Sequence, residues 1–234
     1  MARRFYKTVE VVACEGGYGV LLDGRAVRTP AKRPLTVSTE ALARDIAGEW
    51  AAQSAEIQPA SMPLTQISCT ALDLLAEPEA VGRAVDKLVS FAETELLCYR
   101  AEDPPELAER QEALWQPLLD WLALTHDAPL MATTGILAVE QPRTALDALR
   151  GLLGRFEPPR RAALATAVRA SGSLVVGLAL LDGRIDVRQA FEASELDETF
   201  NIERWGEDPL AKDRRDGVLF DLDAAWRFSR LLSG

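Results

Sequence analysis

Acidic side chains gather in one stretch near the carboxyl end of the chain, between residues 192 and 208. This stretch holds seven aspartates and glutamates and a single basic residue, Arg204. Glu195 and Glu198 are three positions apart, so a helix would place both carboxylates on one side. Such a pair could act as a general acid and base or bind a hard cation. An enzyme built on this stretch would use Glu195, Glu198 and Asp208, although helical surfaces commonly carry such pairs.

The same stretch also carries large apolar residues among its acids. If residues 193–205 form one helix, its side chains turn by about 100° per residue. That geometry places Glu195, Glu198, Ile202 and Trp205 opposite Ala193, Leu196 and Phe200. One interpretation is a solvated acidic face whose tryptophan packs under a neighbouring element. The other is a protein-binding surface, because interfaces combine buried aromatic anchors with charged rims.

Other common catalytic and metal-binding patterns are absent from the sequence. His126 is the only histidine, and the three cysteines Cys14, Cys69 and Cys98 are far apart, so neither a zinc site nor a disulfide framework is indicated. No phosphate-binding GxxxxGK[ST] segment is present, and Ser171 lacks the GxSxG frame of a nucleophile elbow. We therefore expect no cofactor and no metal, and we expect Ser173 to cap the apolar segment that follows it.

Composition indicates a soluble globular protein of 234 residues, with 48% apolar residues and a net charge of −10. The negative charge disfavours nucleic acid and anionic membrane as partners, since both attract clustered lysine and arginine. The longest apolar run, residues 174–181, is too short to span a bilayer, so membrane insertion is not expected. The first residues resemble neither a secretory signal nor a transit peptide, which predicts a cytoplasmic location.

Two patterns of hydrophobicity divide the chain. Short β-branched runs separated by turn residues fill the first 36 positions, and Asp23-Gly24 is a strong hairpin signal. Helical spacing begins at Ser38, where Ser38-Thr39-Glu40 offers a cap. The sequence thus predicts an α+β protein, with a small N-terminal β-meander domain over residues 1–37 and a larger all-helical domain over residues 38–234.

The helical region contains several predicted helices whose tryptophans are expected in the core at positions 50, 115 and 121. Residues 131–139 could form a short strand or an extended linker, and Gly217 is expected to divide the last helix. The helices after the first are predicted over residues 64–76, 80–97, 105–124, 143–156, 158–170, 173–181, 187–205 and 209–232.

Short motifs recur along the chain in one order. The opening strands carry Arg4–Lys7, Leu22–Arg25 and Thr29-Pro30, followed by Glu49-Trp50, Gln53, Ile57, Pro59, Met62–Thr65, Thr70-Ala71 and Asp73. Further motifs are Glu93–Arg100, Gln111, Trp115, Pro117, Leu118, Trp121, Gly172–Leu174, Gly177–Ala179, Leu196–Glu198 and Trp205–Asp208. Together they resemble the motifs of the Atp12 family, which are assembly chaperones for the F1 part of ATP synthase. Asn201 departs from the glutamine expected there.

The resemblance implies a chaperone that binds the unassembled F1 α subunit and shields its subunit interface until a β subunit takes its place. It implies no enzymatic activity, no cofactor, no small-molecule substrate and a bacterial, cytoplasmic protein. In the family an acidic residue of the Leu196–Glu198 region is functionally important, and this role is carried to Glu198. A carboxylate enzyme and a structural subunit of a complex remain as alternatives. The candidate partner-binding residues are Glu195, Glu198, Ile202, Trp205, Glu207 and Asp208.

Overall fold

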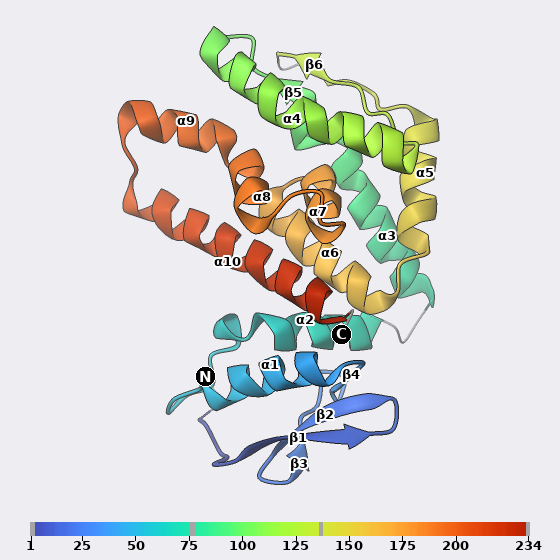
Figure 1. The fold of residues 1–234 in the computed structure, drawn as a ribbon, viewed down its shortest axis with the longest axis vertical. Coiled ribbons are helices and arrows are strands. Elements are labelled where there is room, and N and C mark those ends of the chain that lie inside the picture. The colour runs from blue at the N-terminus through green and yellow to red at the C-terminus, as the bar shows by residue number, and fades with distance from the viewer. Residues whose placement is uncertain (1–2, 75–77, 136–137, 233–234) are drawn as a thin grey trace. The chain divides into compact units, whose positions relative to one another are not determined.

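The structure, a computed structural model, describes residues 3–74, 78–135 and 138–232. The contacts within the chain define two compact units. The first comprises residues 1–80, 157–163 and 224–234, and the second comprises residues 81–156 and 164–223. Each unit is described by itself below, with the elements labelled as in Figure 1.

The first unit is built on a four-stranded antiparallel sheet. Strand β2 (Gly17–Leu22) pairs with β1 (Val9–Cys14), with β3 (Arg25–Ala26) and with β4 (Thr36–Val37). Gly17 has a φ of 143°, and a Cβ there would lie 2.1 Å from the carbonyl oxygen of Val37. The turn between β1 and β2 therefore requires glycine at this position.

Two helices and one 3-10 turn complete the N-terminal part of this unit. They are α1 (Glu40–Ala51), η1 (Pro59–Ser61) and α2 (Pro63–Leu74). Helix α1 begins at Thr39, whose hydroxyl accepts a hydrogen bond from the amide of Leu42. Leu42 and Ile46 are fully buried, together with Val20 and Leu22 of the sheet. The helix thus covers one face of the sheet and closes a small core.

The Glu49 carboxylate connects α1 to α2. It accepts hydrogen bonds from the amides of Leu64 and Thr65 at 2.7 and 2.8 Å, and from the Thr65 hydroxyl at 2.7 Å. These groups belong to the first turn of α2, whose amides have no partner within the helix. The side chain of Gln53 holds the loop between the helices through Glu49, Ser61 and Gln58. The motif from Glu49 to Thr65 is therefore a structural unit.

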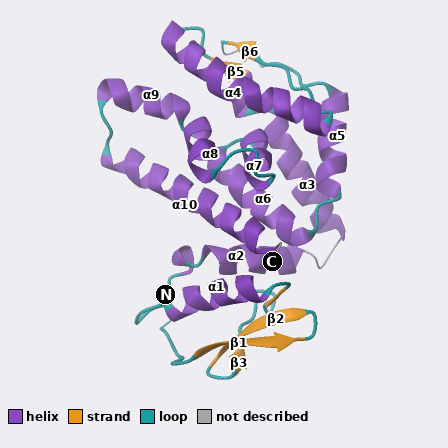
Figure 2. Cartoon of the chain, in the orientation of Figure 1, coloured by secondary structure: helices purple, strands orange, loops and turns teal. Residues whose placement is uncertain are grey.

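In its described residues, the second unit is helical apart from one pair of short parallel strands, as Figure 2 shows. Its apolar helix α7 is buried from Leu174 to Leu180, and the Ser173 hydroxyl caps it by accepting from the amide of Val176. The elements are α3 (Pro78–Glu93), η2 (Leu96–Cys98), β5 (Tyr99–Arg100), α4 (Pro105–His126), β6 (Thr133–Thr134), α5 (Arg143–Gly154), α6 (Pro158–Ser171), α7 (Leu174–Leu181), α8 (Val187–Ser194), α9 (Leu196–Trp205) and α10 (Pro209–Leu232). Helices α6 and α10 contribute residues to both units.

The predicted fold class is confirmed, since a small N-terminal antiparallel sheet precedes a helical region. The last strand of the N-terminal sheet ends at Val37 and the first helix begins at Glu40. The contacts nevertheless group α1 and α2 with the sheet, and the predicted domain boundary at residue 37 stays a prediction. No helix in the described ranges combines the length and the apolar content of a membrane span.

Two helix predictions were wrong. Helix α10 runs without a break from Pro209 to Leu232, because Gly217 keeps helical geometry there. The predicted helix over residues 187–205 is instead two helices, α8 and α9, which meet at Glu195. The end of the helix predicted over residues 64–76 lies outside the described residues, and so do residues 136 and 137 of the predicted strand or linker.

Candidate functional site

Glu195 separates α8 from α9 and is buried, with 5% of the residue exposed. Its backbone, at φ −110° and ψ 18°, leaves the helical region, so the axis changes direction at this position. Asp197 and Glu198 then occupy the first turn of α9, where the helix dipole favours negative charge. Glu195 consequently does not share a helical face with Glu198, contrary to the sequence prediction of one continuous helix.

The Glu195 carboxylate forms a bidentate ion pair with Arg214 of α10. The two guanidinium nitrogens donate at 2.8 and 2.7 Å, and this hydrogen bonding raises the pKa of Arg214. A nitrogen of Arg215 lies 3.8 Å from the same carboxylate. Removing a buried carboxylate from water is costly, and paired hydrogen bonds of this geometry offset the cost. In this structure Glu195 is a link between the start of α9 and α10.

The two acids that follow α9 also have partners inside the fold. The Glu207 carboxylate forms an ion pair with the Nε of Arg215 at 3.4 Å. Asp208 accepts hydrogen bonds from the amides of Leu210 and Ala211, at 2.8 and 3.0 Å, and so caps α10. Both residues remain exposed to solvent. Their carboxylates hold the turn between α9 and α10.

Glu198, Ile202 and Trp205 follow one another at spacings of four and three residues along α9, and we call them the α9 face. Trp205 is 84% exposed, which is unusual for an indole ring, and Leu210 just beyond it is 81% exposed. The side chain of Glu198 is partly exposed. The α9 face therefore presents an exposed indole together with a partly exposed isoleucine and a partly exposed carboxylate.

Glu198 makes no hydrogen bond or ion pair with the residues that the structure describes. Arg204, the base nearest to it in sequence, lies 4.1 Å over the ring of Phe200 and pairs with Glu106 at 3.3 Å. Arg214 is close enough for the Glu198 charge to contribute to the raised pKa of that guanidinium, but its hydrogen bonds go to Glu195. The Glu198 carboxylate can therefore accept a cation from another molecule.

This arrangement suits recognition of a protein better than acid and base chemistry. Of the three carboxylates that an enzyme would use, Glu195 and Asp208 are already bonded within the fold. Among the described residues, no group of three or more histidine, cysteine, aspartate or glutamate side chains is placed to hold a metal ion. An exposed indole next to a free carboxylate is instead a common feature of protein interfaces.

Sequence reasoning missed two carboxylates with structural roles and one groove. The partners of Glu49 lie fifteen residues further along the chain, and those of Glu95 lie nearly eighty residues away, so no local pattern indicates either contact. The groove is a hollow in the surface beside α2, and the sequence of α2 contains a signal for it. Gln66, Cys69 and Asp73 recur at helical spacing and give α2 a second, mixed face.

Comparison with known proteins identifies relatives along nearly the whole chain. Residues 3–123 match the family model described as ATP12 chaperone protein. The mitochondrial protein atp12 of Schizosaccharomyces pombe is 26% identical over 214 residues, which cover 87% of this chain and 74% of that protein.

Solved structures agree with this result. The crystal structure of Atp12 from Paracoccus denitrificans is 40% identical, with a TM-score of 0.89, and the match covers 99% of this chain and 98% of that one. An Asp-to-Lys mutant of the same Paracoccus protein gives a TM-score of 0.89 at 39% identity and the same coverage. Because the family model matches more than half of the residues, the chain belongs to the ATP12 chaperone family.

Proposed function

We propose that this protein is a chaperone for assembly of the F1 sector of ATP synthase, and that it binds the unassembled α subunit through the α9 face. The relatives named above support a chaperone role. An α subunit without its neighbours exposes a large apolar surface, and such surfaces aggregate. A protein that covers this surface prevents aggregation until a β subunit replaces it.

The single observation that carries the proposal is the exposure of Trp205 beside an unpaired Glu198. A chaperone must bind its client and later release it, which favours a few apolar anchors combined with charges that orient the partner. Trp205 and Ile202 provide the anchors, and Glu198 accepts a lysine or arginine of the client. Glu195, Glu207 and Asp208 support this surface by fixing the position of α9 against α10.

The test is to express the α subunit with a tagged form of this chain and to measure soluble and co-purified α subunit. Glu198→Gln keeps the shape of the side chain and breaks no hydrogen bond or ion pair among the described residues, so the melting temperature of the free protein should change little. Loss of a charge pair that binding buries should weaken the complex by about 2 kcal/mol or more. Trp205→Ser should weaken it as well, since it removes the exposed anchor.

Two matched controls separate recognition from general changes of the surface. Glu192 of α8 is an exposed acid paired with Arg188, and Leu124 of α4 is an apolar residue that is 87% exposed. Glu192→Gln and Leu124→Ser should leave the yield of soluble α subunit unchanged. Full protection of the α subunit by Glu198→Gln and Trp205→Ser would contradict the role given to the α9 face.

The alternatives give different results in the same experiment. A chaperone of the α subunit co-purifies with free α subunit and is absent from assembled F1. A structural subunit remains in the assembled complex. An enzyme that uses the carboxylates of this region co-purifies with neither the free α subunit nor assembled F1. Recovery of the chain from purified F1 would therefore replace the proposal with the structural-subunit alternative.

A further inference from the structure

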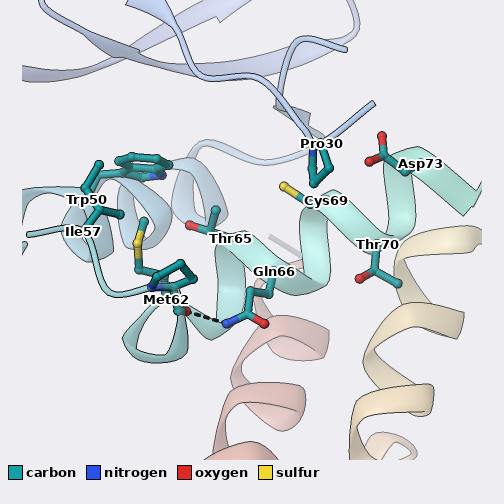
Figure 3. A pocket seen from close by; sticks show the side chains of 10 residues that line it. Pro30, Trp50, Ile57, Met62, Thr65, Gln66, Cys69, Thr70 and Asp73 are labelled. Carbon is teal, nitrogen blue, oxygen red and sulfur yellow. Dashed lines mark hydrogen bonds between the residues drawn. The ribbon is translucent and has the colours of Figure 1, made fainter. Parts of the chain in front are cut away.

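A groove of about 570 Å³ opens within the first unit, beside α2 (Figure 3). Its walls are mostly apolar and come from four segments of the chain: the loop after β3 with Pro30, the end of α1 with Trp50, the segment from Ile57 to Met62, and α2 itself. Pockets that bind small ligands have volumes of about 300–1,000 Å³. The groove is therefore large enough to hold a guest.

Helix α2 has two faces, and only one belongs to the core. Leu64, Ile67 and Ala71 are buried at the spacing of one helical face. Gln66 and Thr70 are exposed on the other side, and Figure 3 shows both near the groove. The groove beside this second face is polar only in part, since Trp50, Ile57 and Met62 lie across the groove from it. No described residue fills the space between them.

The indole of Trp50 forms one wall of the groove and lacks a hydrogen bond. Its Nε1–H is buried and has no acceptor among the described residues. A buried donor without a partner costs about 1–3 kcal/mol, so most such groups are paired. The ring contacts Tyr6 edge to face at 5.8 Å between centroids, and that contact does not involve the donor. Because this N–H is buried, a guest in the groove would contact the apolar ring of Trp50 and not its donor.

The charge of the groove indicates what kind of guest fits. Among the described residues, Asp73 is the only charged side chain that lines it, and no described lysine or arginine does so. The Asp73 carboxylate accepts from the Thr29 hydroxyl at 2.6 Å and from the amide of Ala31 at 3.1 Å, and no described basic side chain lies within 4 Å of it. A carboxylate has acceptor capacity beyond two hydrogen bonds. Burial also raises the pKa of the Cys69 thiol to about 11, so this thiol stays neutral.

We propose that this groove binds an extended apolar peptide segment of the client protein, with a basic residue of the segment beside Asp73. The inference rests on the proposed chaperone function for the identity of the client, while the groove itself is independent of the α9 face. A peptide supplies apolar side chains for the walls, including the ring of Trp50, and a cation for Asp73. Fatty acids and other anionic amphiphiles would place their negative charge beside Asp73 or leave it unpaired.

The methionines allow a direct test, because the chain has only three and Met62 lines the groove. The full protein is labelled with ¹³C at the methionine methyl groups and titrated with the acetylated peptide Lys-Leu-Phe-Leu-Ala while NMR spectra are recorded. We expect the Met62 signal to shift and the signal of Met131, which is in the second unit and 53% exposed, to stay in place. An unmoved Met62 signal at millimolar peptide would overturn the proposal.

Two further ligands and two variants complete the test. Replacing lysine with glutamate in the peptide should weaken binding about fivefold, as expected for one ion pair near the surface. Laurate should leave the Met62 signal unchanged, and a shift with laurate alone would reassign the groove to anionic amphiphiles. Thr70→Trp places an indole at the opening and should reduce peptide binding at least tenfold, whereas Trp205→Ser should not change it. Equal binding by Thr70→Trp would also overturn the proposal.

The result is separable from that of the proposed function. If the α subunit stays insoluble in the presence of the wild-type chain, the chaperone assignment fails, and the titration still decides whether the groove binds peptides. If the α subunit is protected but Met62 does not respond to peptide, the assignment stands and the groove has no such role.

Discussion

Glu95 provides the sharpest test of the physical reasoning in this fold, because it is a carboxylate with no exposed surface. It follows α3 and lies at the start of the buried helix α7. Its oxygens accept hydrogen bonds from the Ser173 hydroxyl, from the amides of Leu174 and Val175 at 3.0 and 3.3 Å, and more weakly from the amide of Leu97 at 3.4 Å. These donors favour the ionised form, whereas removal from water opposes it.

Burial has the larger effect and raises the pKa of Glu95 from 4.5 to about 7. The folded state therefore holds the proton more tightly than the unfolded state does. The contribution of Glu95 to stability is complete below about pH 4.5 and decreases as the pH rises, until the carboxyl group is ionised in the folded protein above about pH 7. The shift corresponds to a loss of about 3 kcal/mol in the free energy of unfolding across this range.

The measurement compares wild type with Glu95→Gln by urea unfolding at a series of pH values from 5 to 8. Glutamine imitates the protonated side chain and does not titrate, so the difference between the two proteins isolates Glu95. We expect the wild type to lose about 2–3 kcal/mol relative to the variant between pH 5 and pH 8. Glu203→Gln, which changes an exposed acid of the same unit, serves as the control and should show no such trend.

A difference that stays constant with pH would refute the reasoning. A wild type that gains stability relative to Glu95→Gln as the pH rises would show that the helix terminus and the hydrogen bonds outweigh desolvation. In that case the pKa of Glu95 would lie below its ordinary value.

Three further predictions follow from contacts in the structure. Glu195→Gln should lower the free energy of unfolding by about 1–3 kcal/mol in a denaturant titration, since it weakens the pair between the buried Glu195 carboxylate and the half-exposed Arg214; wild-type stability would show that the pair contributes nothing. Gly177→Ala should lower the free energy of unfolding by about 1–3 kcal/mol, because the new Cβ would lie 2.8 Å from Val168. At Gly217 an added Cβ meets no atom within 4 Å, so Gly217→Ala should raise the free energy of unfolding by about 0.5–1 kcal/mol. ATP, Mg²⁺ or Zn²⁺ should leave the melting temperature unchanged, and a reproducible rise would support the enzyme alternative.

The parts of the fold that depend on neighbouring residues could be predicted from the sequence. Asp23-Gly24 forms the expected hairpin turn because both residues adopt positive φ, at 47° and 75°. Thr39 and Ser173 cap helices as expected, since a cap requires only a hydroxyl three residues before a free amide. Trp115, expected in the core from its helical spacing, is 1% exposed.

The parts that depend on distant residues could not be predicted. Helical spacing continues through Glu195, and the break there coincides with ion pairs to Arg214 and Arg215, about twenty residues further along the chain. Trp50 has the spacing of a core residue but is only partly buried, because a groove lies on one side of its ring. Helical periodicity identifies the side of a helix that is covered, and it does not show whether that cover is complete.

The acidic stretch shows why a cluster of like charges is weak evidence for a binding site. Its high charge suggests that every carboxylate is available to a partner, yet Glu195, Glu207 and Asp208 have hydrogen bonds or ion pairs within the fold. Changing one of these three would alter the position of α9 and could weaken client binding without any direct contact. Glu198 makes no such bond among the described residues, so among the acids of the candidate site its substitution reports recognition separately from stability. A loss of client binding at Glu195 therefore has to be judged against its effect on the melting temperature, whereas at Glu198 the two effects are expected to separate.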